Sequence, residues 1–296
     1  MTSWLWVIFT VIAAGGQTLR NAMQRELTAI VGTVGATHVR FLFGLPFGIL
    51  FLLVVLAATG EPLPTLGGTM LAWTVVGALS QICATAMLLA AMRERSFVVT
   101  TAYSKTEPVQ VALFGLVFLG DHVTPGLALA ILIATAGVMI MSWPKAASTD
   151  FSWKPVIQGV ASAGLFGIAA VGFRGGIRAL DGPNFVVNAS TVLVAGLLIQ
   201  TAVLTTYLVI FERDNLRAIF RAWRPSLFAG FMGAFASQMW FLAFAVESAA
   251  KVRTLALVEI LFAQIVSRNM FKQAVASREV AGMALIVLGV ILLLHA

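Results

Sequence analysis

Long apolar runs separated by short polar gaps make up the pattern of this chain. Windows of about 20 apolar residues, the length that spans a bilayer, occur at 3–22, 32–58, 69–92, 97–119, 124–143, 155–176, 184–211, 225–246, 251–271 and 279–295. The second and seventh windows are long enough to cross a bilayer at a tilt, and no gap is long enough for a soluble domain. The pattern predicts an all-α polytopic membrane protein with ten transmembrane helices.

Composition agrees with this class. Of the 296 residues, 60% are hydrophobic and 10% are charged, and the mean hydropathy is +0.97, outside the range of ordinary soluble domains. The net charge of +7 does not indicate nucleic acid, because the basic residues lie in the short gaps rather than in a stripe with interleaved aromatics. The first window lacks a basic leader and a small-residue cleavage site, so we expect it to remain a membrane helix. We expect a multi-pass protein of a bacterial-type inner (plasma) membrane.

The window 97–119 carries charges that a lipid-facing helix should lack. Lys105 and Glu107 each cost about 2.5–3.5 kcal/mol on insertion, which roughly cancels the gain of about 5 kcal/mol from the apolar residues around them. Pro108 cannot donate a hydrogen bond to the carbonyl of Ser104, so the helix should kink or open there. Because Lys105 and Glu107 would point about 200° apart on a regular helix, they share a cavity only if the backbone is distorted. We interpret both as substrate-binding residues on a broken helix; the alternative is a packing kink whose charges neighbouring helices satisfy.

Short similarities relate the two halves of the chain. The matching segments are SWLWVI at Ser3 with SWKPVI at Ser152, GALSQ at Gly77 with GAFASQ at Gly233, and Ala136–Val138 with Leu288–Val290. The last pair is shifted by 152 residues, and the same shift places Glu259 on Glu107. We predict one integral membrane domain built from two five-helix repeats, residues 1–146 and 147–296, around a central cavity. Because five is odd, the second repeat enters the membrane inverted, as in many alternating-access carriers.

Three motifs add to this duplication. The fourth window has a proline midway and ends in Leu119-Gly120-Asp121, and a G-x-x-x-x-x-x-G-V element closes the second half at Gly282 to Val290. Its counterpart in the first half has Ala130 in place of the leading glycine. Together with the five-plus-five duplication, these motifs resemble the EamA-type branch of the drug/metabolite transporter superfamily, which usually has Gly-Glu where Gly120-Asp121 stands. The resemblance implies a basket-shaped bundle whose cavity is lined by helices 1, 3, 4, 6, 8 and 9, with helices 5 and 10 at the periphery.

The third window resembles one group within that branch. Aromatic amino-acid exporters carry a short polar patch ending in Ile-Cys on helix 3, which Gln81-Ile82-Cys83 matches. They have an uncharged residue where Glu107 stands, so their substrate does not carry over to this chain.

Glu259 and Tyr103 complete the charged part of the candidate site. Tyr103 lies on the helix face of Glu107, beside other polar residues. Glu259 shares its face with apolar residues, which favours the neutral carboxyl and makes it a candidate for proton exchange with the medium. The alternative for Glu259 is a neutralising pair with Lys105.

Two glutamines and a tryptophan are further candidates. Gln81 and Gln238 are related by the repeat and lie in otherwise apolar windows, where they either line the cavity or form hydrogen bonds between helices. Trp240, with Phe241 beside it, offers a surface for stacking on a planar substrate or a cation; the alternative for both rings is packing.

Several basic residues lie near the ends of the first two windows. Arg40 lies deeper in its run than the others and is a candidate contact for an anionic group. We expect Arg20 and Arg25 to extend to a membrane interface and His38 to be an interface residue.

These features predict a secondary active transporter of small amine-bearing or zwitterionic metabolites such as amino acids, coupled to protons through the midplane carboxylates. Glu107 and Glu259 favour an ammonium group and Lys105 with Arg40 a carboxylate, so a fully anionic substrate should be rejected. Export as the direction follows only from the resemblance. The alternatives are a carrier of cationic drugs or quaternary amines, and a passive channel or lipid scramblase. With three histidines, one cysteine and no catalytic motif, we expect no enzyme activity, no metal site and no cofactor.

Orientation and oligomeric state stay open. The gaps after odd-numbered windows hold most of the lysines and arginines, which places both termini outside the cytoplasm by the positive-inside rule, whereas the resemblance implies cytoplasmic termini. Gly126, Ala130 and Ala134 form a small-residue face that suits close helix packing, either within a monomer or across a homodimer.

Overall fold

The computed structural model describes residues 4–94, 104–141, 153–261 and 277–296, and within these ranges the chain is helical and has no strand. The helices are α1 (Leu5–Leu42), α2 (Gly44–Thr59), α3 (Gly68–Glu94), α5 (Glu107–Phe114), α6 (Pro125–Met141), α7 (Trp153–Arg178), α8 (Phe185–Phe211), α9 (Arg213–Arg221), α10 (Trp223–Val246), α11 (Ala249–Leu255) and α13 (Ser277–His295). A π-helical turn, η2 (Gly115–Leu119), follows α5, and a 3₁₀ turn, η3 (Ala256–Val258), follows α11.

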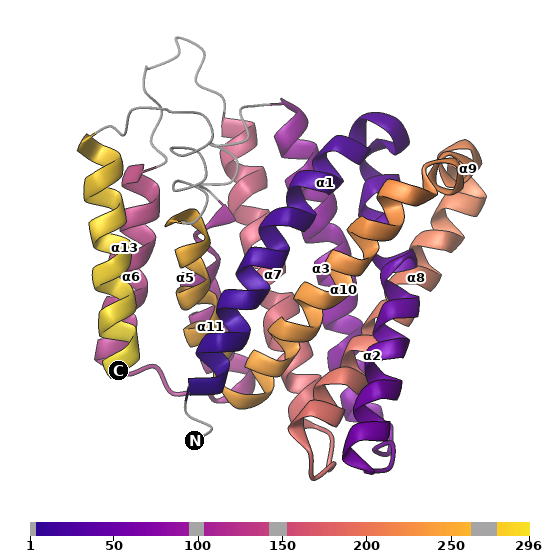
Figure 1. Cartoon of the computed structure of the whole chain (residues 1–296). Coiled ribbons are helices and arrows are strands. Elements are labelled where there is room, and N and C mark those ends of the chain that lie inside the picture. The colour runs from indigo at the N-terminus through magenta and orange to yellow at the C-terminus, as the bar shows by residue number, and fades with distance from the viewer. Residues whose placement is uncertain (1–3, 95–103, 142–152, 262–276) are drawn as a thin grey trace.

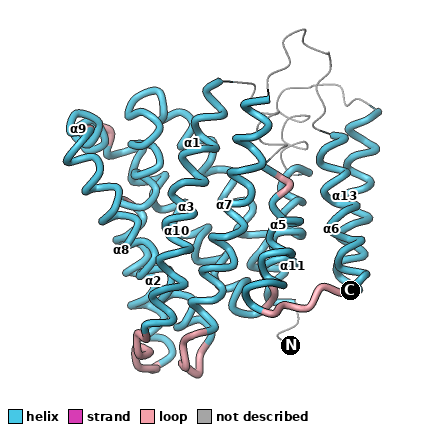
Figure 2. Tube along the Cα trace, turned by 180° about the vertical axis from the view of Figure 1, so that it is seen from behind, coloured by secondary structure: helices cyan, strands magenta, loops and turns pink. Residues whose placement is uncertain are grey.

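The helices stand side by side in one bundle (Figure 1). Helices α6 and α13 form one edge, α2, α8 and α9 form the other, and the remaining helices lie between them (Figures 1 and 2). The start of α1 and the end of α13 lie at the same end of the bundle (Figure 1). We call this end the terminus end.

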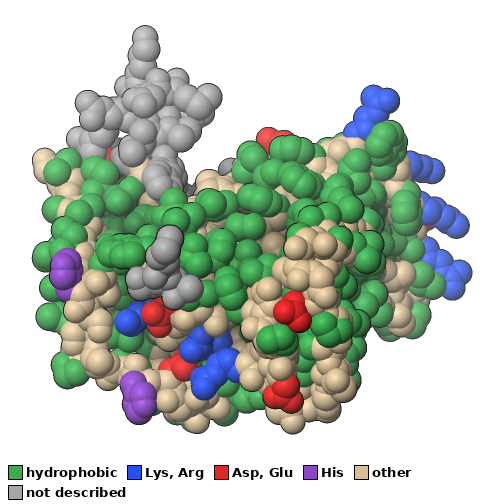
Figure 3. Space-filling model, turned by 60° about the horizontal axis from the view of Figure 1, so that its bottom comes forward, with side chains coloured by type: hydrophobic (Ala, Val, Ile, Leu, Met, Phe, Trp, Pro, Cys, Tyr) green, Lys and Arg blue, Asp and Glu red, His purple; other side chains and the backbone are tan. Residues whose placement is uncertain are grey.

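Several of the described helices meet the requirements of a membrane span. Six are long and apolar enough to cross a bilayer: Glu26–Thr59, Gly68–Ala91, Ile157–Arg178, Phe185–Phe211, Trp223–Val246 and Ser277–His295. Two more apolar helices, Glu107–Leu119 and Pro125–Met141, are shorter. Hydrophobic side chains cover most of the face seen in Figure 3, while lysines and arginines gather at the edge that carries α9 and, beside acidic side chains, in the lower middle of the view. The prediction of an all-α multi-pass membrane protein is confirmed, and the number of ten spans stays a prediction.

The first predicted window, 3–22, ends too early. Helix α1 continues through residues 23–31 and turns at Gly32, whose φ of 71° and ψ of 177° are not helical. The amide of Gln24 crosses this turn and donates to the carbonyl of Ala36 at 3.0 Å. Polar residues between 17 and 28 shortened the predicted window, but Leu27 and Val31 are buried. The part of α1 before the turn at Gly32 is therefore long enough to place Arg20 well inside the bundle.

Glycines set the closest helix contacts. A Cβ atom on Gly282 of α13 would lie 2.6 Å from the carbonyl oxygen of Gly137 on α6. Two turns further along α13, a Cβ atom on Gly289 would lie 2.7 Å from Cβ of Ala134. These residues belong to the predicted G-x-x-x-x-x-x-G-V elements, so the elements act as the packing surface between α6 and α13. The small-residue face of Ala130 and Ala134 is thus used within the chain.

Two helices are interrupted, and a carboxylate follows each interruption. Ser104 is helical, Lys105 and Thr106 form a turn, and α5 restarts at Glu107 with Pro108 in its first turn. Proline is tolerated there because the first turn has no intrahelical partner for its missing N–H. In the second half, α11 tightens into η3, and the α-helix resumes at Glu259. The turn at residues 105–106 agrees with the predicted opening of the helix near Pro108, and residues 97–103 of that predicted helix lie outside the described residues.

Candidate functional site

A polar cavity lies among α1, α3, α5, α7, α10 and α11 and encloses about 600 Å³ of space not occupied by atoms, including its opening. The lining side chains are Gln17, Arg20, Asn21 and Arg40 from α1, Gln81 and Leu88 from α3, Ser104, Lys105 and Glu107 at the start of α5, Phe166 from α7, Trp240 from α10, Arg253 from α11 and Glu259 after η3. The predicted residues Arg40, Gln81, Lys105, Glu107, Trp240 and Glu259 are among them. Tyr103 lies outside the described residues, and Gln238 is not part of the lining.

Two ion pairs join the interrupted helices at this cavity. Lys105 pairs with Glu259, and Nε of Arg253 lies 3.0 Å from Oε1 of Glu107. Each pair takes its cation from one interrupted helix and its carboxylate from the other. The four side chains are only 8–14% exposed, so their charges are largely removed from solvent. Glu259 has the cationic partner that its alternative describes, so both carboxylates of the cavity are paired, and proton exchange at Glu259 stays a prediction.

Arg253 is further held by neighbouring side chains. Its guanidinium lies 4.4 Å from the centre of the Trp240 ring, a distance typical of a cation–π contact. The indole N–H of Trp240 donates to Oε1 of Gln17 at 3.1 Å, and the amide of Gln17 donates to Glu259 at 3.5 Å. Trp240 therefore contacts a cation of the protein itself. Its neighbour Phe241 packs on Phe173 with ring centres 4.6 Å apart. Phe241 therefore has the packing role that was the alternative to substrate stacking.

The structure corrects the expected positions of Arg20 and His38. Arg20 does not reach an interface: it is 3% exposed and lines the cavity. Arg40 is also 3% exposed, as its deeper position in the run indicated. His38 is completely buried, with Nε2 at 3.0 Å from Oγ1 of Thr205 on α8. Both corrections have one cause, because the long bent α1 carries these residues into the bundle rather than to its ends.

The glutamines related by the repeat have different surroundings. Gln81 lines the cavity and accepts a hydrogen bond from Nε2 of Gln200 at 2.8 Å. Gln238 donates to Oγ of Ser190 on α8 at 3.0 Å. It therefore forms a hydrogen bond between helices, which was the alternative to lining the cavity. On the helix face of Glu107, Gln110 turns away from the cavity and donates to the carbonyl of Val160 on α7.

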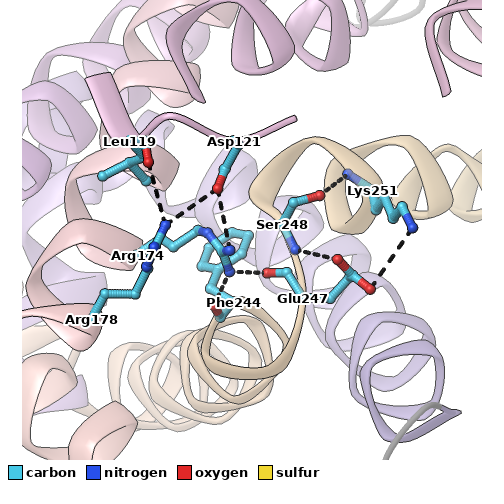
Figure 4. A network of polar contacts seen from close by, with 8 residues as sticks. All are labelled: Leu119, Asp121, Arg174, Arg178, Phe244, Glu247, Ser248 and Lys251. Carbon is cyan, nitrogen blue, oxygen red and sulfur yellow. Dashed lines mark hydrogen bonds and ion pairs between the residues drawn. The ribbon is translucent and has the colours of Figure 1, made fainter. Parts of the chain in front are cut away.

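A second ionic cluster lies near the terminus end (Figure 4). Asp121, in the segment after η2, accepts from Arg174 at 3.4 Å and from Arg178 at 3.3 Å. Arg174 also donates to the backbone carbonyls of Phe244, at 2.7 Å, and Glu247. The cluster ties the end of the fourth predicted helix to α7 and to the end of α10. The pairing of Asp121 with two arginines explains why an acidic residue suits this position.

Sequence reasoning missed Arg20 and Arg253 as cavity residues. Both lie near an end of a predicted window, where arginines usually extend to the interface. One signal in the sequence could have identified them. Glu107 and Glu259 are intramembrane acids, and such acids usually face cations inside a bundle. Arg253, six positions before Glu259 in the sequence, was a candidate on that ground.

Comparisons with known proteins support the fold. A solved structure described as "Crystal structure of protein" resembles this chain with a TM-score of 0.69 over 98% of this chain and 95% of the other, at 15% sequence identity. No family model matches the sequence, and no curated protein matches it significantly. At this identity the likeness shows a shared fold alone, and membership of the EamA-type branch stays a prediction.

Proposed function

We propose that this chain is a secondary active transporter and that the charged cavity binds its substrate. The observation that carries the proposal is the meeting of two irregular helices at a buried cavity: a turn at residues 105–106 precedes Glu107, and the 3₁₀ turn η3 precedes Glu259. In transporters, interrupted helices place backbone and charged groups where a substrate can reach them within the membrane. A structural role alone does not account for so many buried charges around an open space, since each costs free energy to remove from water.

The packing of the helices supports an inverted repeat. Helix α3 packs along α7, and α1 packs along α10. In the numbering of the ten predicted spans these are the pairs 3 with 6 and 1 with 8, which a two-fold axis between the repeats would exchange. Helix α6 with α13 and α2 with α8 are pairs of equivalent spans, 5 with 10 and 2 with 7. Such an axis would also bring Glu107 and Glu259 together at the centre.

The cavity supports recognition of a carboxylate more directly than of an ammonium group. An ammonium reaching Glu107 or Glu259 would have to displace Arg253 or Lys105. Arg20 and Arg40 have no such competing carboxylate among the described residues. We therefore propose carboxylate-bearing metabolites, zwitterionic amino acids included, moved outward in exchange for protons. Protonation of Glu259 would release Lys105 and is the step through which protons act.

Counterflow in proteoliposomes tests the proposal. Liposomes loaded with an unlabelled carboxylate-bearing compound should accumulate its labelled form, and the initial rate should saturate with external concentration. A panel of dicarboxylates, amino acids and quaternary amines covers the candidate substrates. Flux that rises linearly and shows no exchange would contradict a carrier and favour the passive channel.

A further inference from the structure

The charges of the cavity do not balance. Its lining holds four basic side chains, from Arg20, Arg40, Lys105 and Arg253, and two acidic ones, from Glu107 and Glu259. Both acids are paired, with Lys105 and Arg253. Among the described residues the cavity therefore carries two positive charges in excess, and these are the charges of Arg20 and Arg40.

Arg20 and Arg40 have only neutral partners among the described residues. Two nitrogens of Arg20 donate to the side-chain oxygen of Asn21 at 3.3 and 2.8 Å, while its Nη1 is buried without a hydrogen-bond partner. Arg40 reaches the hydroxyls of Thr85, at 3.5 Å, and Ser237, at 3.4 Å. A guanidinium has five donors and cannot lose its proton in a protein, so these long contacts leave donors available for a ligand.

The side chains of Arg20 and Arg40 both pack against Gly233, where the absence of a side chain leaves room for them. A Cβ atom on Gly233 of α10 would lie 3.0 Å from Cγ of Arg40 and 3.6 Å from Cδ of Arg20. Both side chains therefore pass over the same point of α10. Arg253, a third arginine, lines the same cavity. Like charges gathered in one buried cavity are costly unless an anion binds between them.

We propose that the substrate is a small organic dianion whose acidic groups bind at Arg20 and Arg40. A charge of −2 would neutralise the excess of the cavity, and guanidinium groups bind carboxylate and phosphate oxygens with two parallel hydrogen bonds. Leu88 and Phe166 of the lining supply apolar contacts for the carbon part of such a molecule. The inference rests on the proposed function, and it reverses the expectation that a fully anionic substrate is rejected.

Ligand-induced stabilisation of the full-length protein in detergent is the first test. A ligand that binds only the folded state raises the apparent melting temperature, so we expect stabilisation by succinate or by glycerol phosphate at millimolar concentration. Succinate alone would identify a dicarboxylate site, and glycerol phosphate alone a phosphate site. Stabilisation by alanine or choline with no effect of either dianion would overturn the inference, as would no effect of any of the four.

Variants locate the site. Arg20→Gln and Arg40→Gln remove the charge but keep hydrogen-bonding groups, and each should weaken binding of the stabilising dianion by about 10- to 100-fold, the loss expected for a hydrogen bond to a charged group. Arg40→Lys should retain part of the affinity, and Gly233→Ala, whose Cβ atom would crowd the side chain of Arg40 at 3.0 Å, should lower it. The matched control is Arg217→Gln on α9, where the side chain is 71% exposed and affinity should not change. Equal affinity in the Arg20→Gln, Arg40→Gln and Arg217→Gln variants would overturn the inference. If a glutamine variant does not fold, the affinities of Arg40→Lys and Gly233→Ala replace it, and unchanged affinity in both would overturn the inference.

The counterflow assay separates this inference from the proposed function. Dianion binding that requires Arg20 and Arg40 without any counterflow would contradict transport and leave the anion site standing. Saturable counterflow of alanine without dianion binding would support transport and overturn the dianion.

Discussion

Breaking the pair between Arg253 and Glu107 is the sharpest test of the charge arrangement in the cavity. Glu107→Gln keeps the size of the side chain and removes its charge. Arg253, 8% exposed, would then lack a paired carboxylate, because the other acid of the described cavity lining, Glu259, is paired with Lys105. The variant isolates the cost of one unpaired buried charge.

The magnitude follows from the geometry. At a separation of 3.0 Å, two unit charges attract by about 5 kcal/mol for an effective dielectric constant of 20, and desolvation offsets part of this gain. Removing one partner of a buried pair costs about 3–5 kcal/mol because the other charge is stranded. The cation–π contact with Trp240 at 4.4 Å is present before and after the change, so it does not enter the difference in stability. We therefore expect Glu107→Gln to lower the free energy of unfolding by about 3 kcal/mol.

A double-mutant cycle checks this reasoning. Arg253→Met removes the stranded cation, so Glu107→Gln combined with Arg253→Met should lose much less stability than the two single losses added together. Reversible unfolding in mixed SDS micelles, followed by tryptophan fluorescence, measures each variant. The pair of Asp214 and Arg217 on α9 is the control: its atoms are also 3.0 Å apart but the side chains are 95% and 71% exposed, so Asp214→Asn should cost less than about 1 kcal/mol. If Glu107→Gln costs no more than Asp214→Asn, or if the two cavity changes are additive, the reasoning is refuted.

Three further predictions use the same preparations. Glu259→Gln should fold better than Glu107→Gln, because lysine can release its proton and arginine cannot, and it should abolish the pH dependence of counterflow; an unchanged pH profile would exclude Glu259 as the proton carrier. Gly282→Ala should lower the unfolding free energy by about 1–3 kcal/mol, since overpacking would force α6 and α13 apart, whereas Gly15→Ala, whose Cβ atom meets nothing within 4 Å, should be neutral or slightly stabilising. A reporter active only in the cytoplasm and fused after Ala296 should be silent if the arginine bias governs insertion; an active fusion would show that both termini are cytoplasmic.

The positions of the helices were largely predictable, and their ends were not. Apolar windows located α3, α6, α7, α8, α10 and α13, because twenty apolar residues have few alternatives to a membrane helix. The first window failed at residue 22 because polar side chains such as Gln24 are buried by a contact across the turn at Gly32. No local pattern marks such a contact, since it depends on the return of the chain.

The candidate site was predictable as a location rather than as a set of contacts. Lys105, Glu107 and Pro108 identified the cavity because an intramembrane charge beside a proline has few structural explanations. Which cation holds which carboxylate could not be derived, since the partners come from different helices. The charge balance was also missed: Arg20 and Arg253 were not predicted in the cavity, and without them its two basic and two acidic side chains cancel.

The repeat predicts the two acids and leaves their partners unassigned, and the structure gives a physical reason for this difference. A shift of 152 residues aligns Glu107 with Glu259, but Lys105 then aligns with Leu257, and Arg253 with Thr101. The cations therefore occupy different positions in the two halves. Their contacts are nevertheless reciprocal, since each half supplies the cation for the carboxylate of the other. Two carboxylates that meet at the interface of the halves would repel each other unless both were neutralised, and this requirement fixes the charge near each acid without fixing the residue that provides it. Lysine two positions before one glutamate and arginine six positions before the other both satisfy it, because an interrupted helix lets side chains from either position reach across the cavity.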